Sequence, residues 1–356
     1  PAAFVGCDRC VSSTSQGPAT SSTPVPSVAT SSTRAASATS QAARDLPDPH
    51  TLRGLTEVPE LPDPKPVEGS SAQKLPVTVT DVEGNKVTIK STSRILALDL
   101  YGTLSRTLIG LGLGDKIVGR TVSSTEKQLH DRPVVTENGH VLNVEAVAGL
   151  KPSVIIADRS VGPKEALDQL RKSGIPVVLV DPHRSVGSTP QLIRTIADAV
   201  GKPDAGEALV KRTQEQIDQA KKQIAAWKPA KPMRVAFLYV RGNAGVFFIL
   251  GSENGASELI QGVGADDVAS DKGITTLVPA NAESLVSINP DAIFVMRDGL
   301  ASTGGMKGLL ARAGVANTTA GRKQRVISIP DGISLSFGPQ TGEVLTAVAK
   351  ALYGVK

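Results

Sequence analysis

Cysteine and histidine are scarce in this sequence. The two cysteines, Cys7 and Cys10, lie at the extreme N-terminus, so the rest of the 356-residue chain can form neither a disulfide nor a thiolate metal site. Four histidines are too few for a receptor that surrounds a divalent metal ion with several imidazoles and carboxylates. Aromatic residues make up 3% of the chain and the net charge is only +5. These values argue against the basic, aromatic-rich surface that is typical of nucleic-acid binding.

Several longer patterns are also missing. No apolar run approaches the roughly 20 residues that span a bilayer as a helix. There is no Gly-x-Ser-x-Gly turn and no P-loop, and "GLGLGDKIVG" lacks the Gly-x-Gly-x-x-Gly-then-acid arrangement of dinucleotide sites. The sequence therefore predicts a protein that is not an enzyme. What it does contain is 40% hydrophobic residues, in a chain long enough for two cores.

The N-terminus, "AAFVGCDRC", resembles the end of a bacterial lipoprotein signal, in which a small residue precedes the lipidated cysteine. Gly6 and Cys7 fit that pattern. We therefore expect residues 1–7 to be the remnant of such a signal and Cys7 to be the lipidation site. The alternative is a cysteine that lies there by chance.

The next segment has the composition of a tether. Between Val11 and Ser40, 16 of 30 residues are Ser or Thr, which cannot bury enough surface to offset the entropy of the chain. Residues 45–71 are rich in proline, which favours a stiff, extended spacer. We expect residues 8–73 to form a disordered tether and the folded body to begin near Lys74.

From there the pattern is that of an α/β protein. "LPVTVTDVEGNKVTIKS" alternates apolar and polar residues around a Gly-Asn turn, which predicts a β-hairpin. "RILAL" predicts a strand, and "GTLSRTLIGLGLGDKIVG" predicts a helix that ends in glycines. "SVIIA", "KEALDQLRKSG", "PVVLVD" and "TPQLIRTIADAVG" then alternate strand and helix, which favours βαβ units and a parallel sheet.

One segment is repeated. "NVEAVAGLKPSVIIA" begins at Asn143 and "NAESLVSINPDAIFV" begins at Asn281, with Asn, Glu, Pro and Ile at identical offsets. Each copy predicts a helix, a turn at proline and a buried strand. The repeat therefore predicts two related lobes, at residues 74–203 and 229–356. Residues 204–228 between them are rich in helix formers and end at Pro229, which predicts one long, stiff connecting helix of about 33 Å.

These features together are similar to the receptors of ABC importers that serve haem, iron-siderophores and cobalamin. The resemblance rests on the hairpin, "LGLGDKIVGRT", the paired "LKPSVIIAD" and "INPDAIFVM" blocks and the connecting helix, and it covers Leu75 to Tyr353. It implies two Rossmann-like lobes with central sheets, joined by a rigid helix, with a ligand cleft between them. Ligands of open α/β sheets lie beyond the carboxyl ends of the strands.

"RVAFLYVRG" predicts the first core strand of the second lobe, with Tyr239 and Arg241 on one face at its cleft end. A guanidinium beside a phenol favours the phenolate, and tyrosine is a known ligand of haem iron. The spacing alone leaves two interpretations open. Either Tyr239 ligates haem with Arg241 as its activator, or Tyr239 covers the core while Arg241 pairs with a carboxylate.

The resemblance implies a partner for the tyrosine. Haem receptors of actinobacteria hold haem between a histidine of the first lobe and a tyrosine of the second, with an arginine bonded to the tyrosine. The matching residues are His140, Tyr239 and Arg241. His183 follows a strand and is the rival histidine. The expected ligand is ferric haem b, and the alternative is an iron-siderophore or a corrinoid in the same class of receptor.

Further residues at strand ends or on helices are weaker candidates. The expected wall and rim residues of the haem pocket are Arg159, His183, Arg184, Met296 and Arg297. The resemblance also implies one acidic residue on each lobe that docks to the permease, and Glu165 and Glu258 are the candidates.

The resemblance implies partners and a location as well. The partners are the permease and ATPase subunits of the importer and haem-donor proteins at the cell surface. The location is the outer face of the cytoplasmic membrane of a Gram-positive, actinobacterial cell, with a lipid as the anchor. A surface adhesin that uses the same scaffold and binds no ligand tightly is a third hypothesis.

Overall fold

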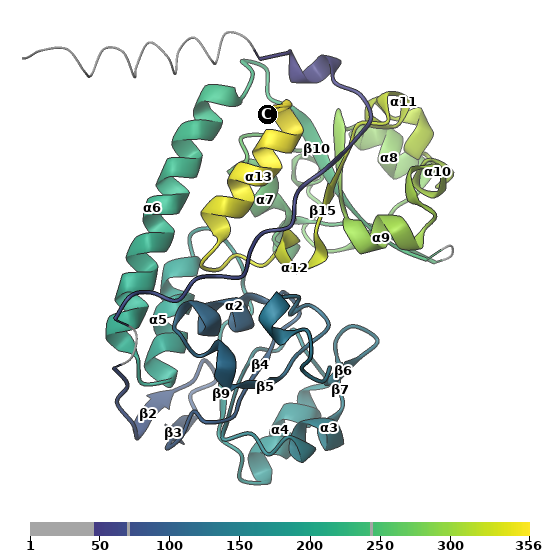
Figure 1. Cartoon of the computed structure of the whole chain (residues 1–356). Helices are drawn as coiled ribbons and strands as arrows, with labels where there is room; N and C mark the ends of the chain where they lie inside the picture. Colours follow the sequence, from purple (N-terminus) through teal and green to yellow (C-terminus); the bar gives the residue numbers. More distant parts are fainter. Residues whose placement is uncertain (1–45, 70–71, 243–244) are drawn as a thin grey trace, which may run out of the picture.

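The structure is a computed structural model that describes residues 46–69, 72–242 and 245–356. Two α/β lobes lie one above the other, and the long helix α6 (Pro203–Trp227) runs along both of them (Figure 1). This is the predicted fold class, and the connecting helix lies within one residue of its expected bounds. None of the described helices combines the length and apolarity required to cross a membrane.

The N-terminal lobe contains a four-stranded parallel sheet in the order β5-β4-β8-β9 and two small antiparallel hairpins. Its elements are β2 (Val77–Thr80), β3 (Lys86–Ile89), β4 (Ile95–Leu98), α2 (Thr103–Gly110), β5 (Ile117–Gly119), β6 (Thr136–Glu137), β7 (Val141–Leu142), α3 (Val144–Gly149), β8 (Val154–Ala157), α4 (Lys164–Lys172), β9 (Val177–Leu179) and α5 (Thr189–Ala199).

The C-terminal lobe is built on a mixed sheet in the order β1-β15-β14-β10-β11-β13, with β12 paired to β10. Its elements are β10 (Arg234–Arg241), β11 (Val246–Ile249), α7 (Ala256–Gly262), β12 (Asp266–Asp267), β13 (Val278–Pro279), α8 (Ala282–Ile288), β14 (Ala292–Met296), α9 (Arg297–Ser302), α10 (Gly305–Leu310), α11 (Thr319–Lys323), β15 (Val326–Ile329), α12 (Asp331–Ser334) and α13 (Thr341–Tyr353). Strands β10, β14 and β15 are parallel neighbours.

The repeated segment has the same local structure in both lobes. Asn143 begins α3 and Asn281 begins α8, and in each case the side chain accepts a hydrogen bond from the backbone N–H three residues later. Each helix leads into a buried strand, β8 or β14. The residue before the proline has a positive φ in both copies, 48° at Lys151 and 37° at Asn289. The four identities seen in the sequence thus correspond to one repeated helix–turn–strand unit.

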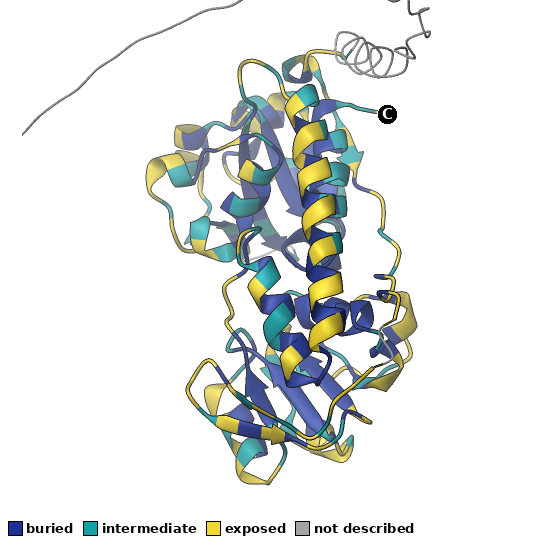
Figure 2. Ribbon diagram, turned by 90° about the vertical axis from the view of Figure 1, so that its left-hand side faces the viewer, coloured by how far each residue is buried: buried dark blue, intermediate teal, exposed yellow. Residues whose placement is uncertain are grey.

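Helix α6 packs closely against both lobes. Figure 2 shows its exposed outer face and its buried inner face, which carries Leu209, Ile217 and Ile224. A Cβ at Gly206 would overlap Ala197 of α5, and a Cβ at Gly342 of α13 would overlap the backbone of α6. Because glycine lets a helix from each lobe approach α6 this closely, α6 is anchored to both lobes.

One expected helix is shorter than its pattern. The segment 102–119 was expected to be a helix, but α2 ends at Gly110 and the chain turns at Gly112, where φ is 78°. Residues Ile117–Gly119 instead form β5, which pairs with β4. Apolar β-branched residues after a glycine turn favour a strand beside a buried neighbour over continuation of the helix.

The expectation that residues 8–73 form a tether is wrong for residues 46–69, which we call the N-terminal segment. Strand β1 (Leu55–Glu57) adds to the edge of the C-terminal sheet in parallel with β15. Val58 follows it into the hydrophobic core and is fully buried. Proline-rich composition favours extended backbone, and here that extended backbone is paired with a sheet rather than left in solvent.

The N-terminal segment then crosses to the other lobe (Figure 1). Both carboxylate oxygens of Asp63 accept hydrogen bonds from backbone N–H groups, those of Lys127 at 2.8 Å and Gln128 at 2.9 Å. The Val67 N–H donates to the carbonyl of Gly110 at the end of α2. The chain therefore connects the lobes twice, once through α6 and once through this segment.

Candidate functional site

A cavity of about 420 Å³ lies between the lobes, at the carboxyl ends of the parallel strands. This volume is in the range of small-molecule sites. The N-terminal lobe contributes Leu100, Tyr101, Val122, Ser123, Thr125, Asn138, Gly139 and His140. The C-terminal lobe contributes Tyr239, Arg241, Leu250, Asn254, Leu277, Met296, Asp298, Asp331, Ser334 and Leu335.

The cavity has apolar side chains on both walls. Leu100, Val122 and Leu277 are 38%, 50% and 40% exposed, and they are among the few large hydrophobic side chains of the described residues that lie open to solvent. Exposed apolar groups that gather at one concave site mark a surface that a ligand or partner covers. The ligand of this cleft therefore has a substantial apolar surface.

Tyr239 and Arg241 lie together on the C-terminal wall, as the alternation along β10 predicts. Both are half-buried, while Val240 between them is buried in the core. The Arg241 guanidinium carbon lies 5.0 Å from the centre of the Tyr239 ring, which is a cation–π contact. Arg241 also forms an ion pair with Asp331, at 2.6 Å between Nη2 and Oδ2. Both arrangements considered for this arginine, a contact with the tyrosine and a pair with a carboxylate, are thus present together.

His140 lies on the opposite wall, at the tip of the β6–β7 hairpin. The strand pairs Thr136–Leu142 and Glu137–Val141 close a loop of three residues, with Asn138 and Gly139 at positive φ (47° and 87°). The backbone carbonyl of His140 accepts a hydrogen bond of 2.9 Å from the Gly162 N–H. The imidazole is exposed, so it is accessible to a ligand in the cavity.

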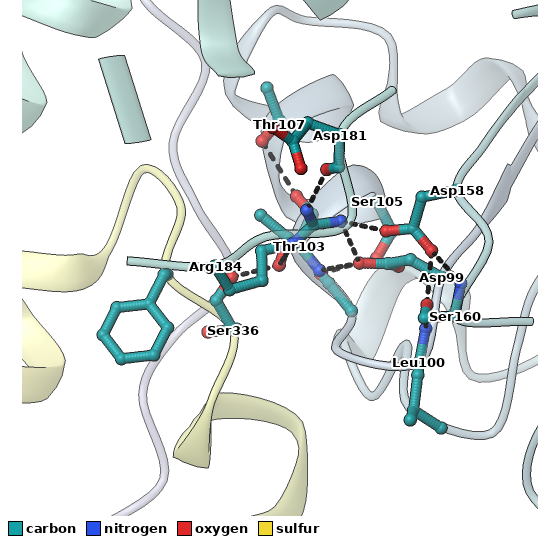
Figure 3. A network of polar contacts seen from close by, with 12 residues as sticks. Asp99, Leu100, Thr103, Ser105, Thr107, Asp158, Ser160, Asp181, Arg184 and Ser336 are labelled. Carbon is teal, nitrogen blue, oxygen red and sulfur yellow. Dashed lines mark hydrogen bonds and ion pairs between the residues drawn. The ribbon is translucent and has the colours of Figure 1, made fainter. Parts of the chain in front are cut away.

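Arg184 was expected to reach the ligand, but it is buried and does not line the cavity. Figure 3 shows it among Asp99, Asp158 and Thr103. It forms ion pairs with Asp158 and Asp99 and donates to the hydroxyl of Thr103 at 3.1 Å. Its guanidinium lies 5.5 Å from the ring centre of Tyr101, which lines the cavity. A buried arginine between two buried aspartates neutralises charges that would otherwise be costly to bury. Because Arg184 is paired with these aspartates, it does not contact a ligand in the cavity.

Burial changes the ionisation of this cluster. The pKa of Asp158 is raised to about 6, mainly by burial of the carboxyl group and secondly by repulsion from Asp99. Burial is also the main cause that raises the pKa of the Tyr101 phenol. Tyr101 is therefore a neutral phenol in the N-terminal wall at ordinary pH.

Three other expected pocket residues also lie outside the cavity lining. Arg159 forms a two-pronged pair with Glu83, at 2.8 Å for each contact. Arg297 pairs with Glu60 of the N-terminal segment at 2.7 Å. His183 is exposed on a loop and does not line the cavity. Of the expected wall residues, Met296 alone lines the cavity, with its sulfur 3.4 Å from Arg241 Nη2.

Asp331 and Asp298 were missed in the sequence, although each comes shortly after a core strand. Asp331 comes two residues after β15, and Asp298 comes two residues after β14. The strand-end rule that selected Tyr239 and Arg241 selects these positions as well. Asn138 and Asn254 were missed because the loops that carry them have no periodic pattern.

The two docking candidates differ in their surroundings. Glu165 is exposed in the first turn of α4. Glu258 in α7 is half-buried, and its carboxylate accepts a hydrogen bond of 3.1 Å from the Val186 N–H across the lobe junction. Cys7, the expected lipidation site, lies outside the described residues.

A larger groove of about 810 Å³ lies between the N-terminal segment, α6 and α13. Its lining includes Gln216, Gln219 and Gln223 of α6.

Comparison with known proteins gives the family. The family model described as periplasmic binding protein matches residues 100–332, and the chain belongs to this family. The chain is 27% identical over 280 residues to the uncharacterized ABC transporter substrate-binding lipoprotein YvrC of Bacillus subtilis, covering 78% of this chain and 86% of that protein. The prediction that the chain is a binding protein of the ABC-importer type and not an enzyme is confirmed by these relatives.

Solved structures give a closer similarity. The chain is 49% identical to the heme binding protein HmuT, with a TM-score of 0.85 and coverage of 87% of this chain and 100% of HmuT. It is 32% identical to the periplasmic heme-binding protein RhuT from Roseiflexus sp. RS-1, with a TM-score of 0.69 and coverage of 74% and 99%. The predicted fold class is confirmed by this similarity.

Proposed function

We propose that the chain is an extracytoplasmic receptor that binds ferric haem b in the cleft between its lobes and delivers it to an ABC permease. His140 and Tyr239 are the axial ligands of the iron, and Arg241 supports the tyrosine. The observation that carries this proposal is that one cavity, lined by residues of both lobes, includes His140 from one lobe and Tyr239 from the other.

The chemistry of the two side chains suits ferric iron. A phenolate is a hard, anionic oxygen donor, and a neighbouring guanidinium favours it over the neutral phenol. An imidazole supplies the second bond from the opposite wall. Arg241 lies over the ring of Tyr239, so its positive charge is close to the phenol. The result is a clamp in which each lobe contributes one bond to the same metal atom.

The spacing of these residues gives further support. Three solved structures are variants of HmuT in which a histidine, a tyrosine or an arginine is replaced by alanine. In HmuT the tyrosine lies 99 positions after that histidine and two positions before that arginine. His140, Tyr239 and Arg241 have the same separations.

The remaining walls suit a porphyrin. Leu100, Val122 and Leu277 cover the faces of the ring, whose burial supplies much of the affinity. The arginines expected to bind the propionates, Arg159, Arg184 and Arg297, are engaged elsewhere. The propionates are instead left to neutral donors of the cavity, Ser123, Thr125, Asn138 and Asn254.

The proposal extends to partners and location. Glu165 and Glu258 dock to the permease, which works with an ATPase, and haem-donor proteins at the cell surface supply the ligand. Because Glu258 already accepts a hydrogen bond from the other lobe, docking through it would also act on the lobe junction. A lipid on Cys7 anchors the receptor to the outer face of the cytoplasmic membrane of a Gram-positive, actinobacterial cell.

A hemin titration of the full chain, followed by its Soret band, tests the ligand. We expect a saturable spectral change, and we expect the band of the complex to move in His140→Ala and in Tyr239→Ala because each variant loses one iron ligand. His183→Ala is the matched control, since that histidine is exposed outside the cavity. Absence of saturation in the unchanged protein, or an equal shift in His183→Ala, would contradict the proposal.

The same titration with cobalamin and with a ferric siderophore tests the alternative. One relative, 24% identical over 299 residues, is a cobalamin-binding protein of Halobacterium salinarum, so this class of ligand occurs among similar proteins. Saturation by a corrinoid or a siderophore without saturation by hemin would replace haem as the assigned ligand. No saturation by any of the three would favour an adhesin.

A further inference from the structure

Three neighbouring strands of the C-terminal sheet end at one cluster of polar side chains. Strands β10, β14 and β15 lie side by side and parallel. Arg241 is the last residue of β10, and Asp298 and Asp331 follow β14 and β15. All three side chains line the cavity that contains Tyr239.

Arg241 is bonded at one end of its guanidinium and has no hydrogen-bond partner among the described residues at the other. Nη2 donates to Asp331 Oδ2 at 2.6 Å. Nη1 is buried and has no hydrogen-bond partner among the described residues. A buried N–H without a partner is costly and calls for an explanation, and one explanation is that the guanidinium is held in this place for its role beside Tyr239.

The backbone beside Arg241 leaves room for this orientation. A Cβ added to Gly299 would overlap Arg241 Nη1 and approach the carbonyl oxygen of Val240. Glycine at this position in α9 thus allows the guanidinium to lie across the end of β10. Any larger residue there would force it to move.

Asp331 is itself held in place. Its Oδ1 accepts a hydrogen bond of 2.8 Å from the backbone N–H of Asp298, while its Oδ2 accepts from Arg241. One carboxylate oxygen is therefore bonded to the start of α9 and the other to the arginine. Its side chain is only 19% exposed, which limits competition by water.

We propose that Asp331 is a positioning residue for the ligand tyrosine: it holds the Arg241 guanidinium over the Tyr239 ring, so that the positive charge supports the tyrosine oxygen when that oxygen binds iron. The inference rests on the proposed function, because it assigns a role in haem ligation. It adds a residue that neither the Tyr-x-Arg pattern nor the cavity alone identifies.

The charge of Asp331 makes the proposal easy to distinguish from a general electrostatic effect. A carboxylate near a phenol disfavours the phenolate. If Asp331 acted only through its charge, its removal would strengthen the tyrosinate–iron bond. If Asp331 acts by holding Arg241, its removal weakens that bond.

The test is a pH titration of the hemin complex, followed by the absorption bands of tyrosinate-ligated ferric haem. The measured quantity is the midpoint pH at which tyrosinate coordination is lost on acidification. The variants are Asp331→Ala, Arg241→Ala and the double variant, with Asp331→Glu as the conservative replacement. Asp298→Asn is the matched control, because it removes a negative charge from the same wall without removing a bond to Arg241.

We expect Asp331→Ala to raise the midpoint by about one pH unit, the size of effect that a close opposite charge has on an ionisable group. Arg241→Ala should raise it at least as far, and the double variant should equal Arg241→Ala. Asp331→Glu should restore part of the loss, and Asp298→Asn should lower the midpoint or leave it unchanged.

A lowered or unchanged midpoint in Asp331→Ala would overturn the inference, as would a double variant whose shift is the sum of the two single shifts. If Asp331→Ala does not fold, Asp331→Asn and Gly299→Ala replace it. The first weakens the hold on Arg241 and the second displaces the arginine by steric overlap, so both should raise the midpoint. Failure of the proposed function is a separate outcome, since the unchanged protein would then form no tyrosinate complex to titrate.

Discussion

The two walls of the cleft are built differently. On the C-terminal wall, Tyr239 lies at the end of a central strand beside Arg241, and Arg241 is bonded to Asp331. On the N-terminal wall, His140 lies at the tip of a short hairpin and has an exposed imidazole. The buried charges of that lobe, Arg184 with Asp99 and Asp158, form a network of their own (Figure 3) and do not line the cavity.

This difference indicates that the two iron-binding side chains contribute unequally to affinity. A side chain held by a bonded network loses little freedom when it binds iron, and such preorganisation improves affinity. A side chain on a hairpin loses more freedom and contributes less. We therefore expect the tyrosine side to determine most of the iron affinity and the histidine side to complete the coordination.

The largest expected effect tests this ranking directly. Tyr239→Ala should weaken hemin binding by more than the ~10- to 100-fold that loss of an outer-shell partner typically costs. His140→Ala should cost less, because ring burial and the tyrosinate remain. Competitive titration with a haem-binding peptide of known affinity measures both constants. A larger loss in His140→Ala than in Tyr239→Ala would reverse the comparison.

The second prediction concerns the charges beneath the N-terminal wall. The pKa of Asp158 is raised to about 6, so the folded protein binds this proton more tightly than the unfolded chain does. Its contribution to the free energy of unfolding is fully present below the usual aspartate pKa near 4. It falls as the pH rises through 6, by up to about 1.4 kcal/mol per pH unit.

Asp158→Asn should remove this pH dependence. The stability of the variant relative to the unchanged protein should therefore rise between pH 4 and pH 6, as measured by thermal or denaturant unfolding. Asp168→Asn is a control of opposite sign, since a hydrogen bond from Arg159 lowers the pKa of that half-buried aspartate, and its effect falls below pH 4. A difference between Asp158→Asn and the unchanged protein that does not vary with pH would contradict the assignment.

The third prediction concerns what the walls share. Leu100 and Leu277 line the cavity from opposite lobes, at 38% and 40% exposure. Leu100→Asn and Leu277→Asn should each weaken hemin binding by roughly fivefold, about 1 kcal/mol for the partial burial of a leucine side chain. Isothermal calorimetry measures the effect. Clearly unequal losses would mean that the porphyrin lies against one wall only.

The smallest expected effect concerns Arg297, next to Met296 in the C-terminal wall. Its pair with Glu60 joins that wall to the N-terminal segment, but Glu60 is 63% exposed. Glu60→Gln should therefore lower the free energy of unfolding by no more than about 1 kcal/mol and leave hemin affinity unchanged. Denaturant unfolding and the hemin titration check both parts. A marked loss of affinity would mean that the segment acts on the cleft.

The sequence predicted the parts of the site that follow from local pattern. The alternation along β10 was enough to bring Tyr239 and Arg241 together, and the strand-end rule was enough to direct them to the cleft. The repeat at Asn143 and Asn281 predicted the two lobes because both copies use the same helix cap. These signals lie within short stretches of the chain.

The errors came from partners that are distant in the sequence. Arg159 pairs with Glu83, 76 positions away, and Arg297 pairs with Glu60, 237 positions away. An arginine at a strand end can bind a ligand or pair with such a carboxylate. Which of the two it does depends on the tertiary fold. Strand β1 was missed for the same reason, since three residues among prolines give no strand signal until β15 lies beside them.

The position of β1 has a practical consequence for making this protein. A recombinant chain begun at Lys74, where composition alone would place the first folded residue, would leave the edge of β15 without its neighbour. The uncovered edge "VISI" is apolar and uncharged, and would offer unpaired backbone groups to another molecule. Such a truncation should self-associate during expression, whereas one begun before Asp48 should not associate through this edge.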